Sequence, residues 1–213
     1  MLFRSVYDVK LGQSPAWMRR RLALVGNNSI SNIVDITNYI MRELGQPLHA
    51  FDCDYLEGNA INVRRATEGE KIVTLDEKEF TLNPNNLVIC DGKKPVALAG
   101  IMGGLNSEVR DTTTEVMFEA AKFARDNIRR SSRALGQGSD ASQRYSKGVD
   151  EYTTEMAMKR ALHLVEELGA GKISKTHKNV NTGNSLEPTT FKTSVKKVNA
   201  VLGITVRSEE HTS

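Results

Sequence analysis

The sequence predicts a mixed α/β domain with an antiparallel, β-sandwich-like core and flanking helices. Three observations lead to this class. Apolar residues recur at helical spacing before residue 45, short β-rich runs alternate with turn residues between residues 60 and 121, and helical spacing returns after residue 125. Because only short turns separate the β-rich runs, these runs are expected to pair as an antiparallel meander.

Two helices are expected in the first 45 residues. In SPAWMRRRLALVG, Ser14 is expected to cap the first helix, Pro15 to take its first position and Gly26 to end it. In SNIVDITNYIMRELG, Gly45 ends the second helix, and Asn38 points away from its apolar stripe. That stripe consists of Ile33, Ile36, Ile40 and Leu44.

The β-rich part is expected to contain short strands in AINVRRA, KIVTL, EFTL, NLVICD and PVALAGIM, followed by EVMFEAA. Side chains alternate between the two faces of a strand. The last strand therefore places Val116, Phe118 and Ala120 on one face and Met117, Glu119 and Ala121 on the other. A carboxylate among small and apolar neighbours is unusual, which makes Glu119 a candidate functional residue.

The C-terminal half is expected to be helical in RDNIRRSSRALG and in DEYTTEMAMKRALHLVEELGAG, followed by a strand in KISKTHKNV. The second helix is expected to end at Gly169 and to bury Met158, Ala161, Leu162, Val165 and Leu168. Residues 181–188 are predicted to be a polar linker. Residues 189–206 are predicted to be the start of another domain, which opens with a helix in TSVKKVNAVLGITV.

Both ends of the chain resemble technical sequence. Residues 1–5 (MLFRS) and 207–213 (RSEEHTS) match translated sequencing-adapter sequence, so they are expected to be scars flanking a chain truncated at both ends. Residues 6–180 are then the main domain.

The composition narrows the class of protein. The net charge of +3 permits an RNA partner without requiring one. The two cysteines, Cys53 and Cys90, form no CxxC pair, so neither a zinc site nor a disulfide scaffold is indicated. No apolar run approaches the ~20 residues that span a bilayer, so no membrane partner is expected. Free thiols without a signal peptide favour a cytoplasmic location.

Two further stretches contain candidate functional residues. His49 lies in GQPLHAFD, within an apolar frame, where a histidine is more often a core or capping residue unless other site residues accompany it. Gly100 and Gly103 lie in ALAGIMGG, where a glycine allows the backbone to approach a ligand closely. An ordinary turn is the alternative, and the spacing is not that of a phosphate-binding loop.

Five stretches carry a resemblance to a known family: VDITNY, GQPLHAFD, ALAGIMGG, MFEAAKF and GSDASQRYSKG. In this order and spacing the chain resembles the B3/B4 region of the bacterial phenylalanyl-tRNA synthetase β subunit, from about Gly12 to Val180. The tail from Pro188 resembles the start of the next β-subunit domain, called B5. The resemblance implies a B3/B4-type fold in residues 6–180 and the truncated start of B5 in residues 189–206.

The resemblance implies an editing hydrolase within an enzyme that attaches phenylalanine to tRNA(Phe). This domain would hydrolyse the ester of mischarged Tyr-tRNA(Phe) with a positioned water, because an apolar synthetic pocket rejects an added hydroxyl by only about 10²-fold. The implied partners are the α subunit, which carries the synthetic site in a heterotetramer of two α and two β subunits, and the acceptor end of tRNA(Phe). ATP and Mg²⁺ would serve the whole synthetase, with no cofactor in this part.

The resemblance also implies roles for particular residues. His49 and Glu119 are the expected catalytic residues, and no metal ligand is implied. Ser139 stands where relatives carry threonine, so it keeps the hydroxyl and loses a methyl group. The expected substrate-binding residues are Thr37, Asn38, His49, Gly100, Gly103, Glu119, Ser139 and Ala141.

Alternatives to this interpretation remain open. The region could be a structural and tRNA-contact module whose editing pocket has decayed, or a freestanding editing protein. Arg125, Arg129 and Arg133 recur at i, i+4 and i+8. This spacing fits phosphate contacts with tRNA, although a solvated helix face is the more ordinary interpretation.

Overall fold

The structure is a computed structural model that describes residues 1–182 and 190–207. The chain divides into two units, Met1–Asn181 and Thr182–Ser213. In unit 2 the structure describes one helix, α6 (Val195–Leu202), which begins after the capping residue Ser194 and ends at Gly203. This confirms the helix expected in TSVKKVNAVLGITV.

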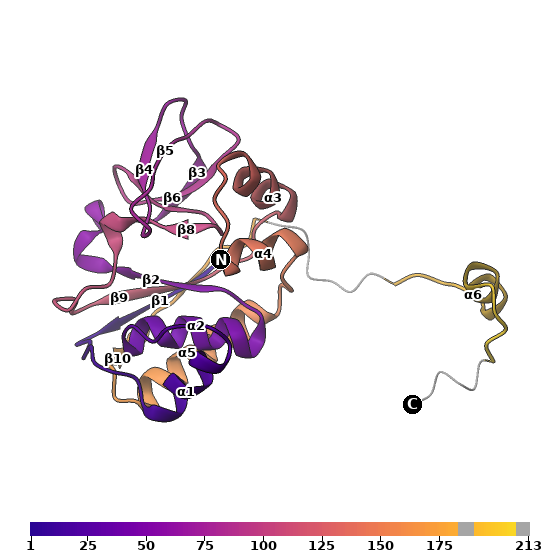
Figure 1. Cartoon of the computed structure of the whole chain (residues 1–213), viewed down its shortest axis with the longest axis horizontal. Helices are drawn as coiled ribbons and strands as arrows, with labels where there is room; N and C mark the ends of the chain where they lie inside the picture. The colour runs from indigo at the N-terminus through magenta and orange to yellow at the C-terminus, as the bar shows by residue number, and fades with distance from the viewer. Residues whose placement is uncertain (183–189, 208–213) are drawn as a thin grey trace. The chain divides into compact units, whose positions relative to one another are not determined.

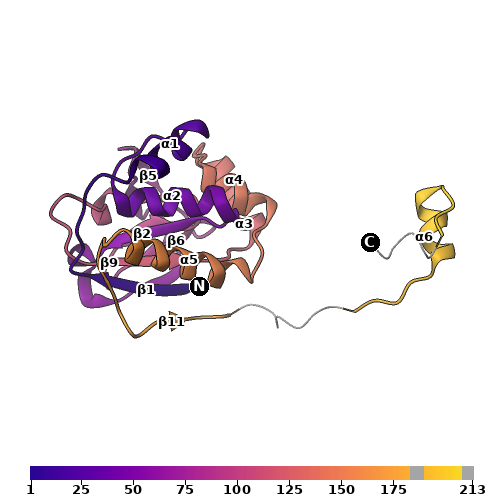
Figure 2. The same cartoon turned by 90° about the horizontal axis from the view of Figure 1, so that it is seen from below.

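The central sheet of unit 1 has five antiparallel strands. Its order is β10-β1-β9-β2, and β11 also pairs with β1. Helices α1 (Ala16–Leu24), α2 (Asn32–Leu44) and α5 (Thr153–Glu167) lie on one face of this sheet (Figures 1 and 2). The strands are β1 (Leu2–Tyr7), β2 (Leu48–Asp52), β9 (Val116–Ala120), β10 (Lys172–Ile173) and β11 (Lys178–Asn179).

A second antiparallel sheet, in the order β3-β6-β7-β8, lies beyond the opposite face of the central sheet. It is accompanied by the β4–β5 hairpin and by helices α3 (Arg125–Ala134) and α4 (Asp140–Lys147). Short 3₁₀ turns occupy Cys53–Tyr55, Glu57–Asn59 and Leu105–Ser107. The strands are β3 (Asn62–Arg65), β4 (Lys71–Val73), β5 (Glu79–Thr81), β6 (Leu87–Cys90), β7 (Pro95–Leu98) and β8 (Met102–Gly103).

The two faces of the central sheet bury two separate hydrophobic cores. β9 contributes to both because its side chains alternate. Val116, Phe118 and Ala120 pack under α2 and α5, whereas Met117 and Ala121 pack toward the second sheet. The prediction of the mixed class with antiparallel sheets is confirmed, and so is the predicted division of the EVMFEAA faces.

The start of α1 differs from the sequence prediction. Pro15 has extended backbone (ψ 152°) and precedes the helix instead of opening it. Ser14 does not cap α1, because its hydroxyl donates to the Asp35 carboxylate on α2 at 2.6 Å. That buried carboxylate also accepts the Ile30 amide at 2.8 Å, so a tertiary contact replaces the local cap. α2 follows the capping residue Ser31 and ends before Gly45, which confirms the predicted end of this helix.

Several elements were not predicted from the sequence. The sequence pattern predicts neither β2 nor α4, and KISKTHKNV forms two short strands, β10 and β11, instead of one. Residues 2–5, expected to be a scar, form part of β1, and their origin stays a prediction. In the expected linker, residues 183–188 lie outside the described part of the chain, as do residues 208–213 of the expected C-terminal scar.

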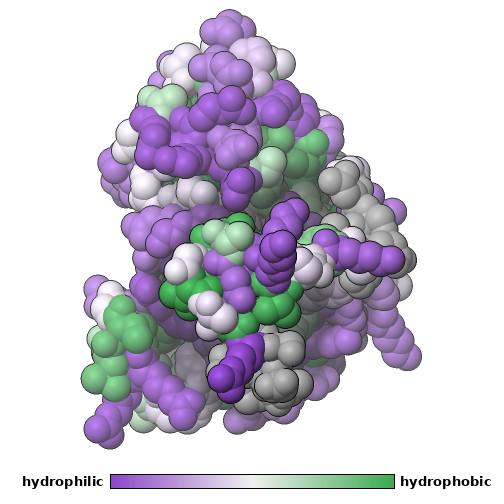
Figure 3. All heavy atoms as spheres, turned by 90° about the vertical axis from the view of Figure 1, so that its right-hand side faces the viewer, coloured by the Kyte–Doolittle hydropathy of each residue, from purple (hydrophilic) through white to green (hydrophobic). Residues whose placement is uncertain are grey.

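The surface of unit 1 is largely polar where β4 and β5 lie, as Figure 3 shows at its upper end. Within the described ranges, 1–182 and 190–207, no helix is long and apolar enough to cross a membrane.

Candidate functional site

Two of the candidate residues meet across the central sheet. β2 and β9 pair antiparallel, with His49 directly opposite Glu119. Directly opposite residues place their side chains on the same face, with Cβ atoms about 5 Å apart. The strand pairing therefore brings together a histidine and a carboxyl group that lie far apart in the sequence.

This face of the pair borders a cavity of about 70 Å³ between the two sheets. The cavity exceeds the ~30 Å³ that one molecule occupies in liquid water. Its wall is mainly apolar, and the polar side chains in it belong to His49, Glu119 and Tyr145. The other lining residues are Pro47, Leu48, Ile89, Ala97, Leu98, Gly100, Ile101, Met102, Gly103, Phe123 and Ala141.

Glu119 is a buried carboxyl group without a neutralising partner. It is 5% exposed, and burial raises its pKa to about 7, opposed in part by the ammonium group of Met1. Among the described residues none donates a hydrogen bond to this carboxyl group, and no arginine forms an ion pair with it. A strand carboxylate held by an arginine therefore does not account for Glu119. Its hydrogen-bonding capacity is free for a ligand.

His49 is held neutral at the same wall. Burial lowers its pKa to about 4. The residue is half-buried as a whole, but its Nε2 atom is buried and has no hydrogen-bond partner in the described part of the chain. The ring packs edge-to-face against Phe51, with centroids 4.4 Å apart. A neutral imidazole has one accepting and one donating nitrogen, so it can orient a water or a polar substrate group.

Side chains of the protein lie close to both glycines. A Cβ on Gly103 would lie 2.5 Å from Cε1 and 2.9 Å from Nε2 of His49. Gly100 has a φ of +67°, and its Cβ would lie 2.9 Å from the Phe123 ring. Side chains of the cavity wall thus fill the space beside both glycines, whereas the sequence prediction assigned that space to the ligand.

Ser139 acts at the edge of the cavity. Its hydroxyl accepts the Ser142 amide at 3.0 Å and caps α4, and it donates to the Ile101 carbonyl at 2.6 Å. Ser139 therefore ties the start of α4 to the β7–β8 turn, which contains Gly100 and is followed by Gly103 in β8. Ala141, in the first turn of α4, lines the cavity.

Replacing Ser139 with alanine is expected to lower the free energy of unfolding by about 1 kcal/mol, the usual effect of losing an N-cap, with a further loss from the unpaired Ile101 carbonyl. Urea unfolding followed by circular dichroism measures this change. Ser139→Thr keeps the hydroxyl and is the matched control. A threonine variant as unstable as the alanine variant would contradict the hydroxyl's role.

Three candidates, Thr37, Asn38 and Ser139, are not among the residues that line the cavity. The Thr37 hydroxyl donates to the Val34 carbonyl within α2 at 2.7 Å, and Asn38 is half-buried on the same helix. Five of the eight expected residues line the cavity, namely His49, Gly100, Gly103, Glu119 and Ala141. The roles of all eight in substrate binding or catalysis stay predictions.

Two aromatic residues of the wall were not singled out from the sequence. Tyr145 and Phe123 pack edge-to-face with centroids 5.1 Å apart, and the buried Tyr145 hydroxyl donates to the Ala121 carbonyl at 3.1 Å. Burial, and secondarily the Glu119 carboxylate, raise the pKa of Tyr145. Phe123 lies in MFEAAKF and Tyr145 in GSDASQRYSKG, so the family resemblance of these two stretches could have pointed to both residues.

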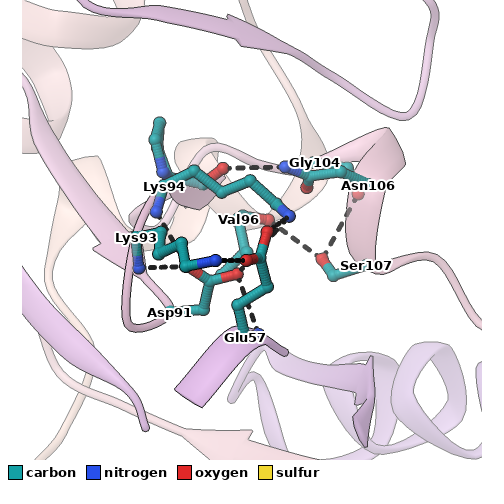
Figure 4. Close-up of polar contacts among 9 residues, drawn as sticks. Glu57, Asp91, Lys93, Lys94, Val96, Gly104, Asn106 and Ser107 are labelled. Atoms are coloured by element: carbon teal, nitrogen blue, oxygen red, sulfur yellow. Dashed lines mark hydrogen bonds and ion pairs between the residues drawn. The ribbon is translucent and has the colours of Figure 1, made fainter. Parts of the chain in front are cut away.

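Polar contacts hold the β6–β7 hairpin next to the cavity (Figure 4). Asp91 accepts the amides of Lys93 and Lys94 at 2.7 and 2.8 Å and that of Glu57 at 3.1 Å. On the other side, the Val96 carbonyl accepts the Gly104 amide at 2.8 Å and the Ser107 hydroxyl at 3.1 Å. These contacts fix the β6–β7 turn and the first residues of β7.

The stability of the fold should depend on the ionisation of Glu119. Its pKa is about 7 in the folded state and 4.5 ordinarily, so the folded state binds the additional proton between these values. The contribution of Glu119 to stability is therefore greatest below pH 4.5 and is lost as the pH rises through 7. The wild type should lose about 3 kcal/mol relative to Glu119→Gln over this range, because one pKa unit corresponds to about 1.4 kcal/mol.

Urea unfolding of both proteins from pH 4.5 to 8 measures this difference. His49 has the opposite dependence, since its lowered pKa makes stability rise with pH between about 4 and 6.5. Because His49 is present in both proteins, its contribution cancels. Parallel pH profiles for the two proteins would show that Glu119 does not titrate as described.

Within the described ranges, no group of three or more His, Cys, Asp or Glu side chains is arranged to hold a metal ion.

Comparison with known proteins defines the class. Residues 1–170 match the B3/4 domain, and the chain belongs to this family. The chain is similar to the phenylalanine–tRNA ligase beta subunit of Syntrophus aciditrophicus, at 50% identity over 212 residues, covering 97% of this chain and 26% of that protein. The corresponding subunit of Clostridium acetobutylicum is 46% identical over 207 residues, again covering 97% of this chain and 26% of that protein.

A third relative, the phenylalanine–tRNA ligase beta subunit of Halalkalibacterium halodurans, is 49% identical over 168 residues, covering 79% of this chain and 21% of that protein. The resemblance found in the five sequence stretches is thereby confirmed. The chain spans about a quarter of the length of these relatives.

Proposed function

We propose that unit 1 is an editing hydrolase domain that cleaves the ester of tyrosine from mischarged Tyr-tRNA(Phe). The observation that carries this proposal is the unpartnered, buried carboxyl group of Glu119 in an apolar cavity beside a neutral His49. Such an arrangement fits an aromatic side chain that has one polar group at its end. Tyrosine has this shape, whereas phenylalanine would leave the carboxyl group buried and unpaired.

The discrimination follows from the energies involved. A hydrogen bond between a phenol and an ionised carboxylate contributes roughly 1.5–3 kcal/mol. At about 1.4 kcal/mol per factor of ten, this corresponds to about 10- to 150-fold preference for tyrosine. A synthetic site with an apolar pocket rejects tyrosine only weakly. A second site that requires the hydroxyl can therefore remove tyrosine that was attached in error.

Hydrolysis is proposed to proceed by direct attack of water. Among the described residues that line the cavity there is no serine or cysteine, and the Tyr145 hydroxyl is hydrogen-bonded to the Ala121 carbonyl, so no activated nucleophile for a covalent intermediate is present there. The water oxygen bonds to the carbonyl carbon, the ester bond to the ribose oxygen breaks, and the ribose leaves with a proton. His49 orients the water or a substrate group, and the neighbouring ribose hydroxyl assists. Thr37 and Asn38 are proposed to bind the amino end of the substrate.

The intact protein is proposed to be the β subunit of a cytoplasmic phenylalanyl-tRNA synthetase. This follows from the names of the similar proteins and from the family. Its partners would be the α subunit, which carries the synthetic site and uses ATP and Mg²⁺, and the acceptor end of tRNA(Phe).

Deacylation of Tyr-tRNA(Phe) by the 213-residue chain, with Phe-tRNA(Phe) in parallel, tests the proposed activity. Loss of tyrosine at least tenfold faster than loss of phenylalanine is expected. A folded chain that hydrolyses neither ester would favour the alternative of a structural module with an inactive pocket. Equal hydrolysis of both esters would contradict the proposed specificity.

A further inference from the structure

Helix α3 has an exposed basic face that the proposed reaction does not use. Its buried side consists of Asn127, Ile128 and Ser131, so the opposite side is in solvent. The helix is positively charged, because it contains four arginines and one acidic residue, Asp126. Three of them recur at i, i+4 and i+8 and form a stripe along the helix. The exposed arginines are Arg125, Arg129, Arg130 and Arg133, here called the arginine face.

The arginine face is scarcely neutralised by the rest of the chain. Arg125 lies 3.7 Å from Asp126, a long ion pair between two well-exposed side chains. In the part of the chain that the structure describes, the side chains of Arg129, Arg130 and Arg133 make no ion pair or hydrogen bond. Their guanidinium groups are therefore available to an external anion.

The arginine face lies beside the cavity. Phe123, in the cavity wall, precedes α3 by two residues. α3 also packs against α4, whose Ala141 and Tyr145 line the same cavity. Figure 1 shows α3 and α4 together on the side of the central sheet opposite to α1. A polyanion bound along α3 would thus end close to the cavity.

We propose that the arginine face binds the phosphates of a single RNA strand whose terminal ester enters the cavity. Arginine is well suited to phosphate, because its planar guanidinium donates two parallel hydrogen bonds. The stripe from Arg125 to Arg133 is about 12 Å long at 1.5 Å per residue. Its three arginines follow one another at about 6 Å, which is four residues at 1.5 Å, so the stripe can meet about three successive phosphates. This proposal deepens the proposed function by naming the surface that delivers the ester.

The test is binding of a short, fluorescein-labelled single-stranded RNA to the 213-residue chain, measured by anisotropy across a salt series. The variant is Arg129→Gln/Arg133→Gln, in which glutamine preserves helix propensity and both positions are exposed. The control, Arg20→Gln/Lys175→Gln, removes the same charge from exposed positions on α1 and in the β10–β11 loop.

Loss of two phosphate contacts should weaken binding about 25-fold at 0.1 M salt. The slope of log K against log salt should change from about −2 to about −0.7, because each contact on a single strand contributes about −0.7. The control should stay within about twofold, since distant charges are screened. Equal weakening in variant and control, or no RNA binding by the wild type, would overturn the proposal.

Deacylation kinetics separate this proposal from the proposed function. For Tyr-tRNA(Phe), the arginine variant should raise KM by a similar factor and leave kcat unchanged, because the phosphate contacts are made equally in the ground and transition states. Salt-dependent RNA binding that requires Arg129 and Arg133, without ester hydrolysis, would retain the docking surface and contradict the editing activity. A fall in kcat with unchanged KM would contradict the docking role.

Discussion

Replacing Glu119 with alanine is expected to abolish the preference for tyrosyl over phenylalanyl esters, lowering the ratio of their kcat/KM values by about 10- to 150-fold. The physical reason is the loss of the acceptor for the phenol at the buried end of the cavity. Hydrolysis of the tyrosyl ester should become slower. Hydrolysis of the phenylalanyl ester should become faster, because phenylalanine no longer leaves a carboxyl group unpaired. Deacylation of both aminoacyl-tRNAs measures the ratio.

Glu119→Gln is the matched control, because it keeps the size of the side chain and removes the charge. A neutral amide still accepts a hydrogen bond, worth about 1 kcal/mol, so this variant should retain an intermediate preference. At pH 8 it should also be more stable than the wild type, since the buried charge is gone. If the alanine variant kept the wild-type ratio, Glu119 would not be the group that recognises tyrosine.

Replacing Gly103 with alanine is expected to reduce deacylation of Tyr-tRNA(Phe) by roughly 100-fold while the domain stays folded. The added Cβ would lie 2.5 Å from the His49 ring, so the imidazole has to shift into the cavity. A displacement of about 1 Å at a reacting site can have an effect of this size. Deacylation rates, with circular dichroism as the check of folding, measure the outcome.

Two controls show whether the effect passes through His49. Gly12→Ala adds the same methyl group at a position where a Cβ meets nothing within 4 Å, so its activity should be unchanged. The double variant Gly103→Ala/His49→Ala should be no slower than His49→Ala alone, because the clashing ring is absent. A further large loss in the double variant would mean that Gly103 acts independently of His49.

Local patterns in the sequence predict single features of the site, but they do not predict that strands β2 and β9 pair and bring His49 opposite Glu119. The unusual position of Glu119 follows from strand alternation alone, and the structure confirms the two faces of EVMFEAA. The register of β2 against β9 is a contact between distant segments, and no local pattern specifies it. The sequence does not predict β2, because LHAFD is short and lacks the alternation typical of a half-buried strand.

Other differences have the same origin in tertiary contacts. Serine is a common capping residue, but the Ser14 hydroxyl donates its hydrogen bond to the buried carboxylate of Asp35 instead. Gly103 was predicted to leave room for a ligand, whereas the structure shows the room filled by His49. In both cases residue type and spacing pointed to an important position. The physical reason for that residue came from a segment far away in the chain.

The most direct test of the central claim is a crystal structure of the chain with a non-hydrolysable tyrosyl-adenosine analogue. We expect the ring to lie in the cavity among Phe123, Tyr145 and Leu98, with its phenol oxygen hydrogen-bonded to Glu119. A charge-assisted bond of this type should measure about 2.5–2.7 Å between oxygen atoms. An analogue bound with its phenol away from Glu119, or bound outside the cavity, would contradict the account.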